Sequence, residues 1–311
     1  MRLLKVGTRD SELAIWQAHH IIDLLEPYGI QAELELISSD GDKDLESPLY
    51  EIGIQGIFTK AIDAALLAGK VDIGVHSYKD VPTKLAEGLK IAAVPKRGES
   101  HDVLVHTDKD LQFDLEKELV IASSSSRRMA QWLNRYPNSR IESLRGNINT
   151  RLRKLQDKKD WDGAIFAFAG IDRIGLKVPF MKQLDWMVPA PAQGALVVVC
   201  REDDLHTIDV CAKIDDRATH ICTDIERSFL KGVMGGCSTP AGGLAVMHDD
   251  EVHFHGNLLS PDGKEKTEIR KVIKAEDHSE AGLDAALEML KNGGQEILDL
   301  LHAVEPQNNK N

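Results

Sequence analysis

One short segment of the sequence combines a hydroxyl group, a cation and a carboxylate directly after an apolar run. Residues 71–75 are typical of a short buried strand, and Ser77, Lys79 and Asp80 follow them. Pro82 then ends ladder pairing, because its nitrogen has no hydrogen to donate. Open α/β sheets bind ligands at the carboxyl ends of their strands, so the segment is a candidate site. A Lys79–Asp80 ion pair that only closes the strand end is an equally good interpretation of this segment alone.

Six arginines are expected where strands end or helices begin, not along exposed helix faces. They are Arg9, Arg127, Arg128, Arg145, Arg151 and Arg173. A guanidinium group matches a carboxylate through two parallel hydrogen bonds, and each charge-assisted bond contributes roughly 1.5–3 kcal/mol. The alternative is a set of exposed salt bridges, each worth under about 1 kcal/mol. In an acidic chain this placement favours a binding site for a ligand with several anionic groups.

Cys237 is the second chemical feature, because it follows two glycines that leave room for a large group to attach to its sulfur. Flanking backbone amides can also favour the thiolate, which is the reactive form. Composition alone favours a buried structural cysteine instead, which is our interpretation of Cys200, Cys211 and Cys222. The four cysteines form no CxxC pair, so we expect a reducing compartment and neither a disulfide scaffold nor a zinc knuckle.

The twelve histidines raise the question of a metal site. His253 and His255 alternate along an expected strand and share a face, but no third ligand occurs at suitable spacing. We therefore interpret this pair as a solvated strand face and expect no metal. His76 is interpreted as a satisfied group at a strand end. Lys79 would form a Schiff base only if desolvated, and the adjacent Asp80 is expected to keep it protonated.

Length and composition set the broader limits. A chain of 311 residues predicts two or three domains, and 42% hydrophobic with 28% charged residues is enough for a real core. The formal charge of −12 argues against general nucleic-acid binding, which needs a basic surface. No apolar run is long enough to span a bilayer or to form a signal-peptide core. We expect a soluble cytoplasmic protein.

The elements that must position these residues follow an α/β pattern. Strands are expected at residues 3–8, 31–37, 71–75, 89–94, 102–106, 119–122, 163–167, 195–200, 244–247, 252–258 and 267–273, and helices are expected to end near residues 25, 67, 136, 156, 231, 290 and 301. The succession of strand, hydroxyl-rich turn, arginine and helix start occurs near Arg9 and again near Arg127, which predicts two related α/β units. The polar segment 38–48 is expected to be a mobile loop, and the chain after residue 214 a small α+β domain.

Several motifs in one order resemble the porphobilinogen deaminase (hydroxymethylbilane synthase) family over nearly the whole chain. They are Gly7-Thr8-Arg9, Leu13-Ala14-Ile15-Trp16-Gln17, residues 75–82, Ser124-Ser125-Ser126-Arg127-Arg128, Leu144-Arg145-Gly146-Asn147 with Thr150-Arg151, Ala169-Gly170, Pro189-Ala190 with Gln193-Gly194-Ala195, Glu226-Arg227 and Gly235-Gly236-Cys237.

The resemblance implies two periplasmic-binding-protein-like α/β lobes with a cleft between them, and a small C-terminal α+β domain. It places residues 1–96 and 192–213 in lobe 1, residues 97–191 in lobe 2 and residues 214–311 in the C-terminal domain. It implies a dipyrromethane cofactor joined to Cys237 through a thioether. Four porphobilinogen molecules are then added head to tail with loss of ammonia, and hydrolysis releases linear hydroxymethylbilane.

The resemblance also assigns roles to residues, with Asp80 as the catalytic carboxylate. The residues implied to bind the cofactor are Ser11, Ser77, Lys79, Ser124, Ser125, Arg127, Arg128, Arg145, Gly146 and Arg151. The residues implied to bind the substrate are Arg9, Gln17, Phe58, Arg145, Arg151 and Arg173. The implied partner is porphobilinogen, without nucleic acid or membrane, and the implied state is a monomer.

The sequence departs from the usual family pattern at several positions. Glu51 and Gln55 lie in a loop that is usually rich in lysine, His101 and Gly232 replace common arginines, and Ala192 replaces a glycine. Two other functions stay open at this point. One is a non-catalytic two-lobed binding protein for a small polycarboxylate, and the other is thiol-based acyl transfer, which needs a histidine near the cysteine.

Overall fold

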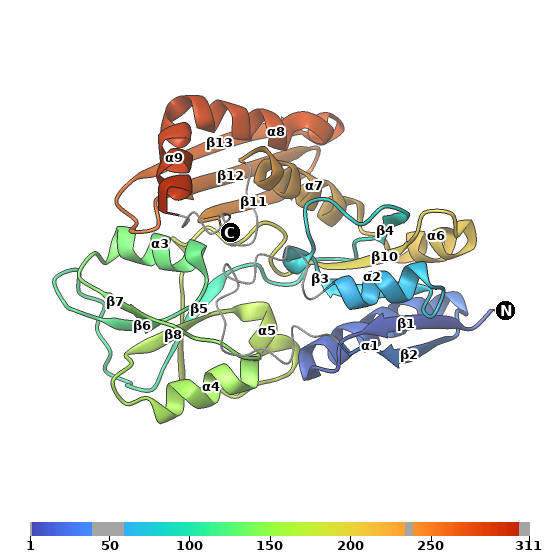
Figure 1. Cartoon of the computed structure of the whole chain (residues 1–311), viewed down its shortest axis with the longest axis horizontal. Helices are drawn as coiled ribbons and strands as arrows, with labels where there is room; N and C mark the ends of the chain where they lie inside the picture. Colours follow the sequence, from blue (N-terminus) through green and yellow to red (C-terminus); the bar gives the residue numbers. More distant parts are fainter. Residues whose placement is uncertain (1, 39–58, 234–238, 305–311) are drawn as a thin grey trace, which may run out of the picture.

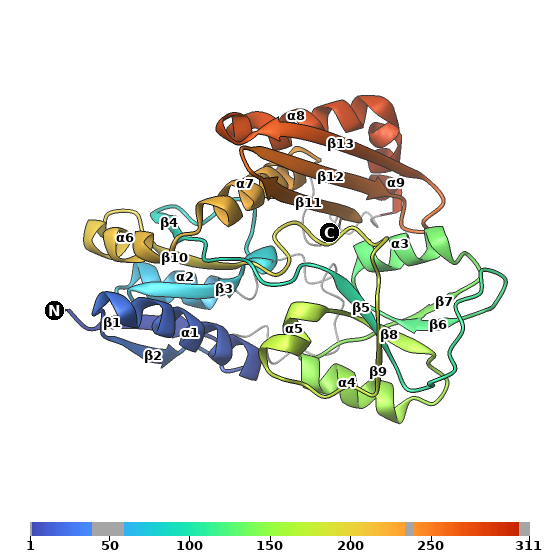
Figure 2. The ribbon, with the colours of Figure 1, turned by 180° about the vertical axis from the view of Figure 1, so that it is seen from behind.

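Three β-sheets organise the protein, and each is the centre of one structural unit (Figure 1). The computed structural model describes residues 2–38, 59–233 and 239–304. Two sheets belong to α/β lobes that lie beside each other, and the third belongs to a smaller C-terminal domain that packs across both, as the view from behind also shows (Figure 2). Most of the expected loop at residues 38–48 lies outside the described residues.

The first lobe has a five-stranded sheet in the order β2-β1-β3-β10-β4, in which β10 runs antiparallel to both neighbours. Its strands are β1 (Leu4–Thr8), β2 (Ala32–Leu36), β3 (Ile73–Ser77), β4 (Leu89–Ala93) and β10 (Leu196–Arg201), and its helices are α1 (Glu12–Leu25), α2 (Lys60–Leu67) and α6 (Leu205–Cys211). Both faces of the sheet are apolar, because helices cover both. Ile73 and Val198 pack with Ile21 of α1, whereas Val197 packs with Ile62 of α2.

The second lobe repeats this strand order as β7-β6-β8-β5-β9, with β5 antiparallel to both neighbours. Its strands are β5 (Asp102–His106), β6 (Val120–Ala122), β7 (Arg140–Glu142), β8 (Gly163–Ala167) and β9 (Phe180–Gln183), and its helices are α3 (Ser126–Arg135), α4 (Ile148–Asp157) and α5 (Phe168–Arg173). The shared order confirms the predicted pair of related α/β units. The chain crosses between the lobes twice, from β4 to β5 and from β9 to β10.

The C-terminal domain is an antiparallel three-stranded sheet with helices packed on one face. Its elements are α7 (Arg217–Gly232), β11 (Ala241–His248), β12 (Glu251–Leu259), β13 (Lys266–Lys274), α8 (His278–Met289) and α9 (Gln295–Val304). Phe229 of α7 and Phe254 of β12 are fully buried, with ring centroids 5.0 Å apart. The predicted architecture, two α/β lobes and a small C-terminal α+β domain, is confirmed. No helix in the described part of the chain is long and apolar enough to cross a membrane.

One buried carboxylate joins all three units. Glu226 on α7 accepts two hydrogen bonds from Arg97, at 2.6 and 3.1 Å, and Arg97 lies in the first crossing between the lobes. Its oxygens also accept from the backbone N–H of Ala192, in the second crossing, at 2.6 Å, and of Ala245, on β11, at 2.8 Å. The C-terminal domain is therefore tied directly to both segments that cross between the lobes.

Candidate active site

The strand β3 leads directly into the candidate catalytic turn. One turn of 3-10 helix, Tyr78–Asp80, follows Ser77, and the Tyr78 ring is buried. Arg227 of α7 donates to the carbonyl oxygens of Val81 and Pro82 at 2.7 and 2.6 Å, and its guanidinium lies 5.0 Å from the centre of the Tyr78 ring. The turn is thus fixed at its start by the strand β3 and at its end by hydrogen bonds from the C-terminal domain.

A cavity of about 220 Å³ opens beside this turn, where the two lobes and the C-terminal domain meet. The structure brings eight of the expected site residues together in its lining: Lys79, Asp80, Ser124, Ser125, Arg127, Arg128, Arg145 and Arg151. Thr239 also lines the cavity, two residues after Cys237 in the sequence. Cys237 itself and Phe58 lie outside the described residues.

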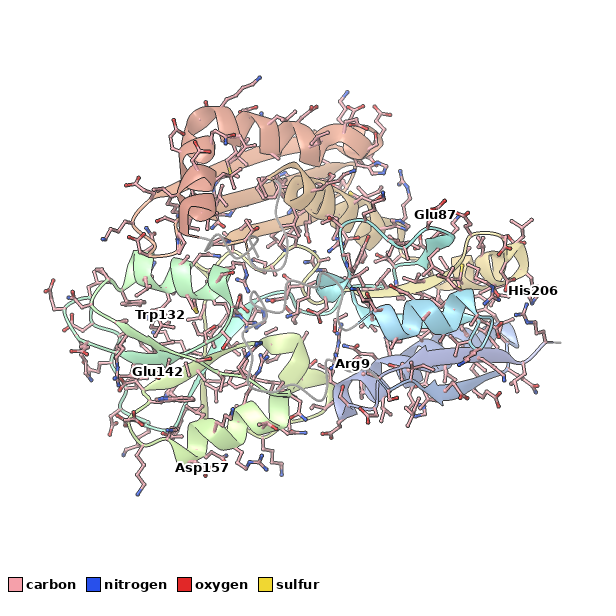
Figure 3. All side chains as sticks on the ribbon, viewed as in Figure 1. Arg9, Glu87, Trp132, Glu142, Asp157 and His206 are labelled. Atoms are coloured by element: carbon pink, nitrogen blue, oxygen red, sulfur yellow. The ribbon has the colours of Figure 1, made fainter. Side chains whose placement is uncertain are left out.

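Other expected site residues do not belong to the described lining of this cavity. Ser11 caps α1, because its Oγ accepts from the backbone N–H of Ala14 at 3.4 Å. Gln17 and Ser77 are hydrogen-bonded to each other at 2.8 Å. Figure 3 places Arg9 at the edge of lobe 1 that faces lobe 2. These residues lie on the lobe 1 side of the cleft, next to β3.

Gly146 and Arg173 stabilise backbone segments next to the cavity, the first through its own conformation and the second through a hydrogen bond. Gly146 has φ 110°, and a Cβ there would lie 2.9 Å from Cβ of Thr150, so the turn before α4 requires glycine. Its carbonyl accepts from Nε of Arg151 at 2.8 Å, which fixes that side chain at the cavity. Arg173 donates to the carbonyl of Gly194 at 2.6 Å, and burial lowers the pKa of Arg173 to about 10.

Lys79 and Asp80 do not form the simple ion pair that the strand end suggested. Nζ of Lys79 donates to Oε1 of Gln193 at 3.2 Å, and the described residues contain no salt bridge between Lys79 and Asp80. Burial lowers the pKa of Lys79 to about 8, although Asp80 favours its charged form. Lys79 is therefore still mainly protonated at neutral pH, but by a much smaller margin than an exposed lysine.

Arg127 and Arg128 are buried and share a carboxylate that the sequence arguments missed. Asp102, the fully buried first residue of β5, accepts from Nη1 of Arg127 at 2.7 Å and from Nε and Nη2 of Arg128 at 3.0 and 2.8 Å. Burial opposes its charge, but the two arginines hold the pKa of Asp102 well below its usual range. The only signal in the sequence is an acidic residue at the start of an apolar strand.

His76 differs from its interpretation as a satisfied strand-end group. Its ring is buried, and Nε2 has no hydrogen-bond partner among the described residues. Burial, with a further contribution from Arg9, lowers the pKa of His76 to about 4. The interpretation is therefore wrong, because this ring is held neutral and its buried Nε2 has no hydrogen-bond partner among the described residues.

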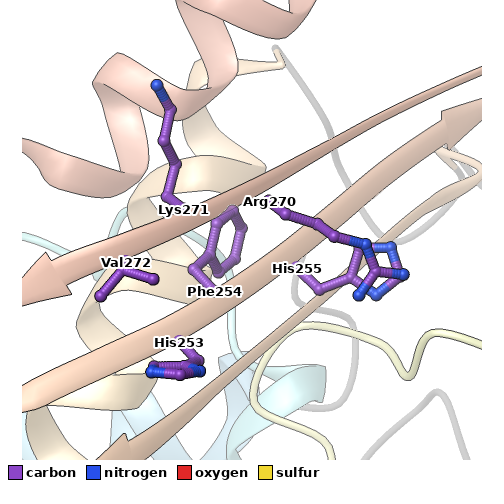
Figure 4. A pocket seen from close by; sticks show the side chains of 6 residues that line it. All are labelled: His253, Phe254, His255, Arg270, Lys271 and Val272. Carbon is purple, nitrogen blue, oxygen red and sulfur yellow. The ribbon is translucent and has the colours of Figure 1, made fainter.

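The histidines of the C-terminal sheet do not belong to the described lining of this cavity. Figure 4 shows the shallow hollow that His253 and His255 help to line, with Arg270 and Val272 of β13 beside them. His253 is exposed, as the predicted solvated face requires, but the prediction is wrong for His255. Its Nε2 is buried without a hydrogen-bond partner among the described residues and lies 3.5 Å from Oε1 of Glu268. Within the described ranges, no three side chains come together that could hold a metal ion.

Three of the unusual residues have visible surroundings. His101 stacks on Phe168, with ring centroids 4.7 Å apart. Gly232 lies against α8, where a Cβ would come within 2.5 Å of Cβ of Ala286. Ala192 is fully buried and adopts a left-handed conformation with φ 63°, which glycine adopts more readily. Glu51 and Gln55 lie outside the described residues.

The cavity combines cations from both lobes with one exposed carboxylate, Asp80, which favours the charged form of Arg151. A ligand with several carboxylates fits such a lining, and Asp80 can stabilise positive charge or accept an N–H from the same ligand. Fold and site therefore define a two-lobed α/β protein with a cation-lined cavity where its lobes and the C-terminal domain meet.

Comparison with known proteins gives the family. The family models "Porphobilinogen deaminase, dipyromethane cofactor binding domain" and "Porphobilinogen deaminase, C-terminal domain" match residues 4–209 and 220–291. The porphobilinogen deaminase of Maridesulfovibrio salexigens is 40% identical over 306 residues, which are 97% of this chain and 99% of that protein. That of Nitratiruptor sp. is 37% identical over 306 residues, covering 97% of each chain. The chain belongs to the porphobilinogen deaminase family, as its motifs predicted.

More distant likenesses exist among solved structures. The periplasmic VFT2 domain of Bordetella pertussis BvgS is 12% identical with a TM-score of 0.40, covering 68% of this chain and 86% of that chain. A periplasmic substrate-binding protein of an ABC transporter from Coxiella burnetii is 14% identical with a TM-score of 0.39, covering 70% and 94%.

Proposed function

We propose that this chain is a hydroxymethylbilane synthase. It joins four porphobilinogen molecules head to tail, with loss of one ammonia at each addition, and then releases linear hydroxymethylbilane by hydrolysis. The observation that carries this proposal is the meeting of Asp80 with cations of both lobes around one cavity, in a chain of the porphobilinogen deaminase family. Porphobilinogen carries acetate and propionate groups, which suit such cations.

The residues present fit the dipyrromethane cofactor of this family. Nε of Arg127 is buried beside the cavity without a hydrogen-bond partner among the described residues, so this donor can serve a ligand carboxylate. Lys79, Arg128, Arg145 and Arg151 line the same space, and Cys237 is the proposed attachment point through a thioether. When bound, the cofactor supplies the primer to which the first substrate is joined.

Asp80 is the proposed catalytic residue. When ammonia leaves the aminomethyl group of the substrate, positive charge develops on the methylene-pyrrole. A carboxylate that faces the cavity opposes this charge and can accept the pyrrole N–H. The carbon–carbon bond then forms as the acceptor pyrrole loses a proton, so that each addition releases one ammonia. Asp80 is exposed at the cavity and can therefore face a ligand that binds there.

The remaining assignments are part of the same proposal. The proposed cofactor contacts include Ser11, Ser77, Ser124, Ser125 and Gly146, and the proposed substrate contacts include Arg9, Gln17, Phe58 and Arg173. We place lobe 1 at residues 1–96 and 192–213, lobe 2 at residues 97–191 and the C-terminal domain at residues 214–311. The chain is proposed to act as a monomer in the cytoplasm. Nothing in the family comparison supports a non-catalytic binding protein.

One intact-mass measurement tests the central proposal. The purified full-length protein is expected to carry a covalent adduct of dipyrromethane size, and the Cys237→Ser variant is expected to lack both the adduct and the activity. Incubation of wild type with porphobilinogen is expected to add further masses in steps of one pyrrole unit. An unmodified wild type that still forms product would overturn the proposed attachment.

A further inference from the structure

Three cations of the candidate site are connected to one buried carboxylate. Asp102 binds Arg127 and Arg128 directly, as described above, and its Oδ1 also accepts from Nε2 of Gln193 at 3.0 Å. Oε1 of the same Gln193 accepts from Nζ of Lys79 at 3.2 Å. A continuous path of hydrogen bonds therefore runs from lobe 2, through the second crossing between the lobes, to the catalytic turn of lobe 1.

The orientation of Gln193 is fixed by its partners. Its Nε2 donates to the carbonyl of Ser100 at 2.8 Å as well as to Asp102, so both hydrogens of the amide are used. The other end must be the carbonyl oxygen, because a lysine ammonium group only donates. Gln193 is fully buried and cannot turn towards water. Because Gln193 is hydrogen-bonded to both groups, it holds Nζ of Lys79 in a fixed position relative to Asp102.

Asp102 also limits what the two arginines can do. All three nitrogens of Arg128 have partners, because Nη1 donates to the carbonyl of Ile165 at 3.1 Å and the others bind Asp102. Nη1 of Arg127 is shared between Asp102 and the carbonyl of Val188, at 2.8 Å from the latter. Their guanidinium planes are therefore set before any ligand arrives, and within the described part of the chain Nε of Arg127 has no hydrogen-bond partner.

We propose that Asp102 is the positioning residue of this site: through direct ion pairs with Arg127 and Arg128, and through Gln193 with Lys79, it fixes the three cations that receive the ligand's carboxylates. The inference deepens the proposed function and rests on it for the identity of the ligand. Without Asp102, the buried Arg127 and Arg128 would lose the carboxylate with which both form ion pairs. Among the described residues, Lys79 would then keep only Asp80 as an opposing charge. Prealigned donors also bind a carboxylate without losing side-chain freedom at that moment.

The charge of Lys79 gives this role a specific readout. The groups that face Lys79 are Asp80 on its own turn, Arg127 and Arg128 on α3, and Asp102 on β5. Asp102 favours the ammonium form, and both arginines oppose it. Burial has already lowered the pKa of Lys79 to about 8, so removal of the negative charge at position 102 is expected to lower this pKa further.

The test measures the pH at which Lys79 reacts with an amine reagent. The purified full-length protein is treated with a trace of acetic anhydride across a range of pH, and labelling is read by mass spectrometry of the Lys79 peptide. Lys264, whose side chain is 82% exposed, is the internal reference. In Asp102→Asn the pH of half-maximal labelling is expected to fall by about one unit or more. The double variant Asp102→Asn/Gln193→Glu places a carboxylate at the side chain that contacts Lys79 directly. In this variant the pH of half-maximal labelling is expected to return towards the wild-type value.

A merely structural role for Asp102 predicts a different result. The control is Asp162→Asn, which removes another carboxylate of lobe 2, one that accepts from the backbone N–H of Val120 at 2.7 Å and does not line the cavity. This control is expected to leave Lys79 labelling unchanged. Equal labelling in wild type and Asp102→Asn, or no recovery in the double variant, would overturn the proposal.

Two further arms keep the test decisive. If Asp102→Asn does not fold, Gln193→Met breaks the path while leaving both arginine ion pairs intact, and an unchanged labelling pH in that variant overturns the relay. With porphobilinogen as substrate, Asp102→Asn is expected to lower kcat/KM by about 100-fold, and Asp162→Asn by less than about 3-fold. If wild type shows no turnover but the labelling shifts occur, the proposed function fails and the positioning role of Asp102 stands.

Discussion

The carboxylate of Glu226 offers the sharpest test of how the three units are held together. Its Oε1 accepts from Arg97 and from the backbone of Ala245, and its Oε2 accepts from Arg97 and from the backbone of Ala192. The side chain of Glu226 is 0% exposed and that of Arg97 is 12% exposed, so water cannot replace these bonds. Glu226→Gln keeps the shape of the side chain and exchanges one acceptor oxygen for an NH₂ group.

The expected loss follows from this geometry. In either orientation of the new amide, its NH₂ group points at two of the four N–H donors, so two of the four hydrogen bonds are lost. Each buried donor that is left without a partner costs about 1–3 kcal/mol. Arg97 also loses its opposing charge, and breaking a buried ion pair in this way typically costs about 3–5 kcal/mol in total. We therefore expect the free energy of unfolding to fall by about 3–5 kcal/mol, which lowers the melting temperature by roughly 10 °C.

Thermal unfolding followed by circular dichroism at constant pH measures this effect. The matched control is Glu288→Gln on α8, because Glu288 forms an ion pair with Lys271 but its side chain is 49% exposed. Exposed pairs contribute under about 1 kcal/mol, so the control is expected to melt within about 3 °C of wild type. Similar melting temperatures for the two variants would refute the argument that burial of Glu226 makes its charge essential.

Three other perturbations have defined outcomes. Asp80→Asn is expected to keep the covalent adduct and lose about three powers of ten in product formation, since a unit charge pair at 4 Å and an effective dielectric of 20 is worth about 4 kcal/mol; near-normal turnover contradicts the assignment. His76 has a pKa of about 4 in the folded protein against 6.5 in the unfolded chain, so below pH 6.5 the unfolded chain binds a proton that the folded protein does not. The free energy of unfolding should fall by up to about 1.4 kcal/mol per pH unit as the pH drops from 6.5 to 4. Urea titrations at several pH values should show that this free energy falls less steeply with pH in His76→Gln than in wild type; an equal fall in both proteins would exclude His76 as the cause. Gly232→Arg restores a common family residue, yet Cβ of Ala286 leaves no space for it. The free energy of unfolding should therefore fall by about 1–3 kcal/mol, measured as a lower urea midpoint; an unchanged midpoint would show that α8 moves aside.

The sequence was sufficient to predict those strands and helices whose own residues follow a clear apolar pattern. Residues 163–167 form a short apolar run and were predicted as the strand β8 with its observed bounds. By contrast, β9 (Phe180–Gln183) was missed, because all four of its side chains are exposed and only backbone pairing with β5 makes it a strand. The short edge strand β7 and the helix α6 were missed as well. Elements defined by their neighbours leave little trace in their own residues.

For the site, the sequence determined which residue types were available, and the order of motifs determined the family. It could not determine which charges pair, because Asp102 and Arg127 are 25 residues apart and meet only when β5 and α3 pack in lobe 2. Lys79 and Asp80 show that closeness in the sequence does not predict pairing either. They are adjacent in the chain, yet the fold turns Lys79 to Gln193, 114 residues away, and leaves Asp80 exposed at the cavity. Burial then decides the energetics, because the strength of a charge depends on the water that the tertiary structure removes from it.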